Sequence, residues 1–293
     1  MFVAFRRVAR IVPFLAFVAA ASAQDALVPL GGVDAVSMGF ASTCALADDG
    51  QVLCWGRNTE GQLGIGSEFP RATAVPVQGL PGPATAVASG RLHVCAIVGG
   101  EVWCWGRNFY GEIGDGTVVS RVSPVRVLGI AGGATALALG DLHSCAIVDG
   151  GVRCWGNNVY GQLGDGTGVD ATFAVPVGAL ASGVTQIVAG ALHTCALQGG
   201  AMKCWGANYD RQIGDPAAGD TVLEPAQVDG LASGVVAMAV GTAHTCAIVG
   251  AGAVRCWGNN ERYQLAVDDV GSSDVPIDAT GVGAAALAIT AGA

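Results

Sequence analysis

Residues 143–167 read HSCAIVDGGVRCWGNNVYGQLGDGT, and this stretch determines a β-hairpin residue by residue. Its turn is Asp149-Gly150, a dipeptide typical of the type I′ turn, in which both central residues have positive φ. Counting outward from this two-residue loop places Cys145 opposite Cys154. Opposite residues alternate between hydrogen-bonded and non-hydrogen-bonded pairs, and these two cysteines form a non-hydrogen-bonded pair. The α-carbons of such a pair approach to roughly 4.5 Å, which a disulfide can bridge. The stretch therefore predicts a cross-strand disulfide that staples one hairpin.

The same arithmetic applies to all ten cysteines of the chain. Two of the five pairs are one residue further apart than the others, and their loops, Asp48-Asp49-Gly50 and Gly250-Ala251-Gly252, each gain one residue and end in glycine. A three-residue hairpin loop needs a residue of positive φ, which glycine supplies. Because loop length and cysteine spacing change together, we predict five disulfides. They are Cys44–Cys54, Cys95–Cys104, Cys145–Cys154, Cys195–Cys204 and Cys246–Cys256.

The N-terminus has the composition of a secretory signal peptide. Arginines precede an apolar run over residues 11–20, and Ala21-Ser22-Ala23 is a small-residue cleavage site. We expect residues 1–23 to be removed and the protein to be secreted or periplasmic, an oxidising compartment in which paired cysteines form disulfides. We expect no membrane insertion after signal removal. The net charge of −9 argues against nucleic acid as a partner.

The remaining chain repeats every 50 to 52 residues, each repeat marked by Cys-Trp-Gly. Such a period indicates a solenoid or propeller whose units bury their faces against one another, with the tryptophans as wedges between them. Each unit contains an alanine- and valine-rich strand, the stapled hairpin, a glycine-rich loop and a fourth strand. Proline has no backbone N–H to donate to a neighbouring strand and therefore favours an edge strand. The fourth strand, which contains a proline, should form the outer edge of each sheet. These prolines are Pro76, Pro124, Pro176, Pro225 and Pro276.

The repeat resembles the regulator of chromosome condensation repeat family. The matching residues are Gly140, His143, Cys145 and Ala146, then Cys154, Trp155, Gly156 and Asn158, then Gly161 to Gly166. The resemblance implies a β-propeller of four-stranded blades, seven in the well-known members. It also offers two functional precedents. One is nucleotide exchange on a nuclear GTPase with chromatin binding, and the other is secreted inhibition of a bacterial β-lactamase.

This chain departs from the family in the number of its units. We expect an all-β, propeller-like array of about five four-stranded blades, either incomplete or open. Val28-Pro29-Leu30 matches an outer strand without a hairpin before it, and residues 286–292 match an inner strand without a hairpin after it. We assign residues 24–293 to the array. Its hairpin units lie near residues 39–66, 90–117, 140–167, 190–215 and 241–266.

The four histidines that precede cysteines by two residues suggest zinc as an alternative to disulfides. The first unit retains Cys44 and Cys54 but has Ser42 in the histidine position, so the cysteine pair does not depend on histidine. We therefore expect no metal and no other cofactor, and histidines that pack and hydrogen-bond beside the staple. A triad assembled from His143, Asp141 and Ser144 is disfavoured, because a single active site does not need repeated copies. We expect no catalytic residue.

The loop that follows each Trp-Gly carries residues that differ between units, and loops commonly carry binding function. Tyrosine and arginine are favoured at binding hot spots. The alternative is that these aromatic rings pack locally beneath the loops. The candidate partner-binding residues are Phe109, Tyr110, Tyr160, Tyr209, Arg211, Arg262 and Tyr263.

These observations predict an exported, non-catalytic protein whose loops bind a protein or cell-surface partner. A secreted enzyme inhibitor is one alternative. A glycan-active propeller enzyme is less favoured, because no unique carboxylate pair or nucleophile stands out.

Overall fold

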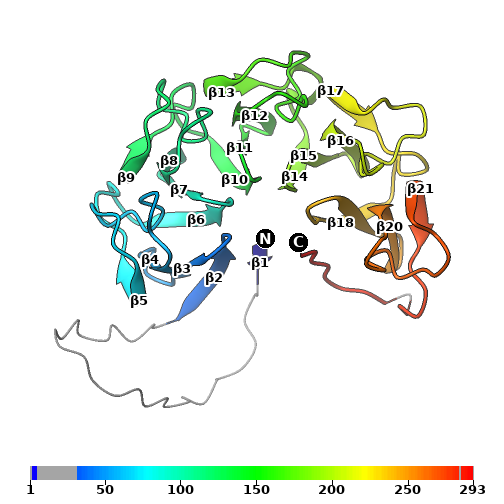
Figure 1. Cartoon of the computed structure of the whole chain (residues 1–293), viewed down its shortest axis with the longest axis horizontal. Coiled ribbons are helices and arrows are strands. Elements are labelled where there is room, and N and C mark those ends of the chain that lie inside the picture. The colour runs from blue at the N-terminus through cyan, green and yellow to red at the C-terminus, as the bar shows by residue number, and fades with distance from the viewer. Residues whose placement is uncertain (1, 5–31, 284, 293) are drawn as a thin grey trace.

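The computed structural model describes residues 2–4, 32–283 and 285–292, and its regular structure is almost entirely β (Figure 1). Five antiparallel sheets follow one another, each built from four strands in chain order, which confirms the predicted repeated all-β architecture. A short strand, β1 (Phe2–Ala4), pairs with the first sheet. Among the described residues the helical structure is a 3₁₀ turn, η1 (Gly178–Leu180), and no helix is long and apolar enough to cross a membrane.

We call each four-stranded sheet a blade and number the blades in chain order. Blade one comprises β2 (Val33–Met38), β3 (Ser42–Ala47), β4 (Val52–Gly56) and β5 (Arg71–Pro76), and blade two comprises β6 (Ala84–Ser89), β7 (His93–Val98), β8 (Glu101–Gly106) and β9 (Arg121–Arg126). Blade three comprises β10 (Ala134–Leu139), β11 (His143–Val148), β12 (Gly151–Gly156) and β13 (Ala171–Pro176). Blade four comprises β14 (Val184–Ala189), β15 (His193–Gln198), β16 (Ala201–Ala207) and β17 (Thr221–Gln227). Blade five comprises β18 (Val235–Val240), β19 (His244–Val249), β20 (Ala253–Asn259) and β21 (Ser272–Asp278).

The strands of each blade are arranged radially. The first strand lies nearest the centre and the fourth lies at the rim (Figure 1). Each rim strand contains a proline, as predicted, because the edge of the sheet requires no donor from that residue.

The hairpins have the predicted register. Cys145 pairs with Cys154 across a turn in which Asp149 has φ 51° and Gly150 has φ 76°. All five predicted disulfides are present, with α-carbons 4.1 Å apart in each. Because all ten cysteines are bonded to one another, none remains as a thiolate ligand for zinc.

Both faces of each inner blade, two to four, are buried against its neighbours. The face of blade three that carries Cys145 and Ile147 packs against Trp205 of blade four. Its other face presents Trp155 to the core of blade two. The tryptophans therefore act as wedges between blades, as predicted. Four of them are fully buried, whereas Trp55 of blade one is half-buried.

The five blades form an open arc (Figure 1). Residues 286–292 lie on blade five in the position of a further first strand: the amide of Ala286 donates to the carbonyl of Gly252 at 3.1 Å, as the amide of Ala134 donates to that of Gly100 at 2.9 Å. At the other end of the arc, Val36 and Met38 of blade one are exposed. Except for Phe2–Ala4, the expected signal peptide lies outside the described residues, as does the segment 28–30.

We expect each staple to stabilise its blade. The paired substitutions C145S and C154S should lower the free energy of unfolding by about 2–3 kcal/mol, because the unfolded chain regains the entropy of a short closed loop. Urea denaturation followed by tryptophan fluorescence measures the loss. Under reducing conditions the variant and the wild type should converge. A difference that persists there would mean that the serine hydroxyls, not the missing crosslink, cause the loss.

Candidate functional site

Two sets of loops emerge at one end of the blades, and together we call them the loop face. The connection between first and second strands and the connection between third and fourth strands meet there, because strands alternate in direction. The amide of Arg107 donates to the carbonyl of Leu92 at 2.9 Å, which joins the two connections in blade two. The loop face consists of residues 39–41, 57–70, 90–92, 107–120, 140–142, 157–170, 190–192, 208–220, 241–243 and 260–271.

A buried asparagine holds each long loop in shape. In blade three, Asn158 Oδ1 accepts from the amide of Leu163 at 3.0 Å, and its Nδ2 donates to the carbonyl of Val169 at 3.1 Å. The same pair of bonds recurs in every blade, so the backbone of the loop is fixed while its tip remains free to vary. The five asparagines are Asn58, Asn108, Asn158, Asn208 and Asn260.

A second polar arrangement, which we call the clasp, joins consecutive blades. Trp155 Nε1 and Ser144 Oγ of blade three donate to the carbonyl of Glu112 in blade two, at 2.8 and 3.0 Å. His93 Nε2 of blade two lies 2.9 Å from the same Ser144 Oγ. Since the serine proton is directed to the carbonyl, His93 must be the donor in this contact. The neutral Nε2-protonated tautomer therefore satisfies the clasp.

The clasp recurs around the arc with one coupled exception. His143 contacts Thr194 at 2.8 Å and His193 contacts Thr245 at 3.1 Å. Between blades one and two, Ser42 occupies the histidine position and Val94 occupies the hydroxyl position. The histidine and its hydroxyl partner are thus both absent at this contact between blades one and two, which we call the first seam. A different hydrogen bond is present there, from the amide of Ser89 to Ser37 Oγ at 2.8 Å.

The clasp histidines are unsuited to acid–base catalysis on an external substrate. Burial lowers the pKa of His93, His143 and His193 to about 3, with Arg107 contributing at His93 and neighbouring histidines at the other two. Their side chains are at most 1% exposed. The Nδ1 atoms of His143 and His193, where a second proton would bind, have no hydrogen-bond partner in the described part of the chain. The histidines thus pack and form hydrogen bonds, as predicted, and these bonds join consecutive blades.

The aromatic candidates lie on the loop face, and most of their rings are exposed. Phe109 is 60% exposed, Tyr209 is 60% and Tyr263 is 69%. Tyr160 of blade three and Tyr209 of blade four meet edge to face, with ring centroids 5.6 Å apart. The rings thus span neighbouring blades, with Tyr263 separate on blade five.

The arginine candidates have different environments. Arg211 forms an ion pair with Asp274 at 2.9 Å, which links blade four to the rim strand of blade five. Arg262 uses its backbone amide to donate to Gln264 Oε1 at 2.8 Å. The structure therefore does not bring the two arginines into one cluster with Phe109 and Tyr110.

A residue that the sequence pattern did not single out, Arg107, organises the loop of blade two. Its guanidinium lies 5.0 Å from the ring centroid of Phe109 and 5.7 Å from that of Tyr110. Its Nε lies 3.5 Å from Oε1 of the buried Glu112. Burial raises the pKa of Glu112, while the backbone amide of Tyr110 opposes that shift. In blade three this pair is replaced by Asn157 and Gln162.

Charge is unevenly distributed over the loop face. The loop-face segments of blades three to five contain nine carboxylates and two arginines, Arg211 and Arg262. In blades one and two the numbers of acidic and basic residues on this face are nearly equal. The acidic residues are Asp141, Asp165, Asp170, Asp210, Asp215, Asp220, Glu261, Asp268 and Asp269.

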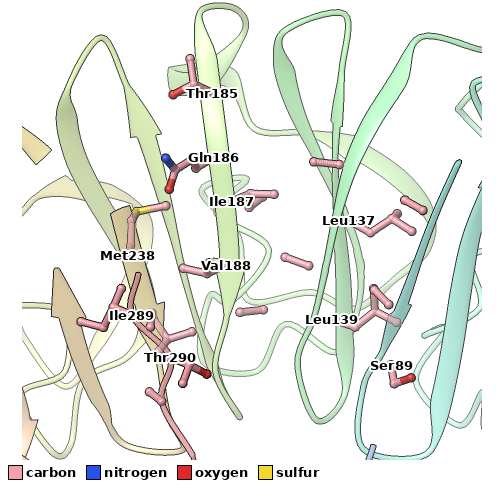
Figure 2. A pocket seen from close by; sticks show the side chains of 18 of the residues that line it. Ser89, Leu137, Leu139, Thr185, Gln186, Ile187, Val188, Met238, Ile289 and Thr290 are labelled. Carbon is pink, nitrogen blue, oxygen red and sulfur yellow. The ribbon is translucent and has the colours of Figure 1, made fainter. Parts of the chain in front are cut away.

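A cavity of about 490 Å³ lies at the centre of the arc, and we call it the channel (Figure 2). The first strands of blades two to five and residues 289–291 line it. Its walls are mainly aliphatic, and none of its lining residues carries a charge.

Comparison with known proteins identifies the repeat. The model of the regulator of chromosome condensation (RCC1) repeat matches residues 49–97, 99–147, 149–197 and 200–248, and a second model of the same repeat matches 33–62, 134–162 and 235–264. Human probable E3 ubiquitin-protein ligase HERC6 is 45% identical over 64 residues, and human HERC3 is 47% identical over 64. Each match covers 21% of this chain and 6% of the relative's length.

Solved structures share the fold. Human WBSCR16 superposes with a TM-score of 0.76 at 23% identity, covering 88% of this chain and 69% of that one. Yeast RCC1 (Prp20), solved bound to Kap60, superposes with a TM-score of 0.77 at 21% identity, covering 89% of this chain and 66% of that one.

We expect acid to destabilise the protein through the clasp histidines. Their folded pKa is depressed, so between about pH 6.5 and pH 3 the unfolded state binds protons that the folded state does not. The free energy of unfolding should therefore fall as pH falls through this range, by up to about 1.4 kcal/mol per pH unit for each histidine. Urea titrations at several pH values measure this slope. H193Q should be less stable at pH 7 and have a shallower slope; an unchanged slope would contradict the assignment.

The seam between blades one and two offers a test of the clasp itself. S42H alone should lower the free energy of unfolding by about 1–3 kcal/mol, because the new imidazole is buried beside Val94 without an acceptor. V94S alone should also lower it, because Val94 is buried in the core between blades one and two. The double variant S42H/V94S should recover about 1 kcal/mol relative to the sum of the single effects. Additive effects in this double-mutant cycle would show that the contact contributes nothing.

Proposed function

The chain belongs to the regulator of chromosome condensation (RCC1) repeat family, and we propose that it is a non-catalytic binding protein whose loop face docks a protein partner. The observation that carries this proposal is the set of exposed aromatic rings, including Phe109, Tyr209 and Tyr263, on loops whose backbone buried asparagines hold in place. Rigid aromatic side chains supply large contact area at a low cost in entropy, so they suit a binding surface.

Two further features extend the aromatic surface. Arg107 is held beneath Phe109 and Tyr110 by Glu112, which adds a cation to the rings of blade two. The loops of blades three to five, which carry Tyr160 and Tyr209, also hold nine carboxylates. This charge favours a partner with a basic docking surface and disfavours nucleic acid. We propose a soluble protein or a protein exposed on a cell surface as that partner.

We further propose that the protein works outside the cytoplasm. Five disulfides suggest an oxidising, extracellular or periplasmic environment. The signal peptide over residues 1–23 stays a prediction from the sequence and agrees with that environment.

As a second candidate function we propose that the protein is a secreted inhibitor that binds an enzyme. Protease–inhibitor complexes show that a rigid loop surface of standard size supports very tight binding. A glycan-active enzyme is less favoured, because the buried clasp histidines have low pKa values and Asp115, Asp165 and Asp215 occupy one repeated loop position. The ligase activity of the human relatives is not carried over, since the match spans 6% of their length.

The neighbouring structures provide precedents at the level of fold. Yeast Prp20 was solved with Kap60, and a second structure of Prp20p was reported with binding properties to Gsp1p and histones. Those partners belong to Prp20. They support the proposal that this fold presents surfaces to other proteins.

We expect the loop face to carry the binding energy. Once a partner is captured from extracellular or periplasmic fractions, the triple variant F109A/Y209A/Y263A should weaken its binding at least about tenfold, because exposed aromatic hot spots cost about 2 kcal/mol or more each. Surface plasmon resonance measures the change. F173A is the matched control, since Phe173 is 50% exposed on the rim strand β13. Equal binding by all variants would place the interface elsewhere, and turnover in a hydrolase screen would favour the enzyme alternative.

A further inference from the structure

The channel differs from the rest of the surface in its chemistry. Figure 2 shows aliphatic side chains such as Leu137, Ile187 and Val188 around it, with threonine side chains among them. The chain carries a net charge of −9, yet no charged residue lines this cavity. A volume of about 490 Å³ falls within the range of sites that enclose small molecules.

One residue of the lining breaks the repeat. Gln186 pairs with Leu197, and the residues at the same register in the other first strands are all alanine. Blade four thus has a long polar side chain at this register, where the other four blades have a methyl group, and Gln186 lies at the channel wall (Figure 2). The alanines are Ala35, Ala86, Ala136 and Ala237.

The structure fixes the orientation of the Gln186 amide. Its Nε2 donates to the carbonyl of Val236 in the neighbouring first strand at 2.9 Å. With the amine end held there, Oε1 remains as the acceptor end, and no donor in the described part of the chain hydrogen-bonds to it. A side-chain acceptor at a fixed position therefore stands in a wall that is otherwise mostly aliphatic.

We propose that the channel binds an uncharged, mainly apolar small molecule that carries one hydrogen-bond donor, and that Gln186 Oε1 accepts from this donor. Transfer of a charged group into a cavity without a counter-charge is costly, so the lining selects against ions. Burial of apolar surface supplies affinity, and one positioned polar group supplies orientation. This site is independent of the loop face.

Three related dyes test the chemical class. N-Phenyl-1-naphthylamine is uncharged, apolar and has one N–H donor, and its fluorescence rises in an apolar environment. Its N-methyl derivative lacks the donor, and 8-anilino-1-naphthalenesulfonate adds a charge. Fluorescence titration of the intact protein should show saturable binding of the first dye with one site per chain, weaker binding of the second and little binding of the third.

Two substitutions locate the site. Q186A should weaken the N–H dye about three- to tenfold and leave the N-methyl dye unchanged, because one hydrogen bond is lost only where a donor exists. A136F should fill the channel and abolish binding of both. Because Ala136 is half-buried, phenylalanine there could disturb folding, and a thermal melt of the A136F variant serves as the folding control. Q186A keeps the comparison valid if A136F fails to fold, since alanine occupies this register in four blades.

Y209A controls for binding to the loop-face rings. The proposal is overturned if the N–H dye does not bind, if Q186A weakens both uncharged dyes equally or neither of them, or if Y209A rather than a channel variant removes binding. Equal, Q186A-sensitive binding of the sulfonated dye would overturn the selection against charge.

Discussion

In blades two to five, the tryptophan of the Cys-Trp-Gly sequence donates from its indole to a carbonyl of the preceding blade, and the rest of this structure depends on that hydrogen bond. It occurs at 2.9, 2.8, 2.9 and 3.0 Å for Trp105, Trp155, Trp205 and Trp257. The indole lies so close to the preceding loop that Gly164, with φ 71°, has no room for a side chain beside Trp205. The glycine-rich loop, the tryptophan wedge and the narrow alanine-rich strands are therefore parts of one packing arrangement.

Features that depend on local spacing could be predicted from the sequence. A two-residue turn fixes the register of a hairpin, so the pairing of Cys145 with Cys154 followed from the spacing alone. The position of residues 286–292 as a further first strand also followed from the repeat. Whether the arc closes depends on the sum of angles between blades, which no local pattern encodes.

The site was only partly predictable, for a related physical reason. The exposed rings of Phe109, Tyr209 and Tyr263 were found because they vary along a repeat. The ion pair of Arg107 with Glu112 and the link from His93 to Ser144 depend on side-chain direction across a loop or between blades. The fixed asparagine bonds and the variable loop tips divide each unit into scaffold and surface. Residues shared by the units, such as these asparagines, therefore report on packing, whereas the loop-tip residues that vary are the candidates for binding.

The coupled absence of histidine and hydroxyl at the first seam implies a preferred order of mutation. If the hydroxyl is lost first, a buried imidazole N–H is left without an acceptor, and the intermediate is penalised. If the histidine is lost first, the hydroxyl can still donate to the carbonyl that Ser144, Thr194 and Thr245 use in the other blades. A lineage can thus arrive at Ser42 and Val94 without passing through a strained ancestor only by replacing the imidazole before the hydroxyl. The same order of replacement would apply at the other junctions, because each pairs a buried histidine with a hydroxyl in the same way.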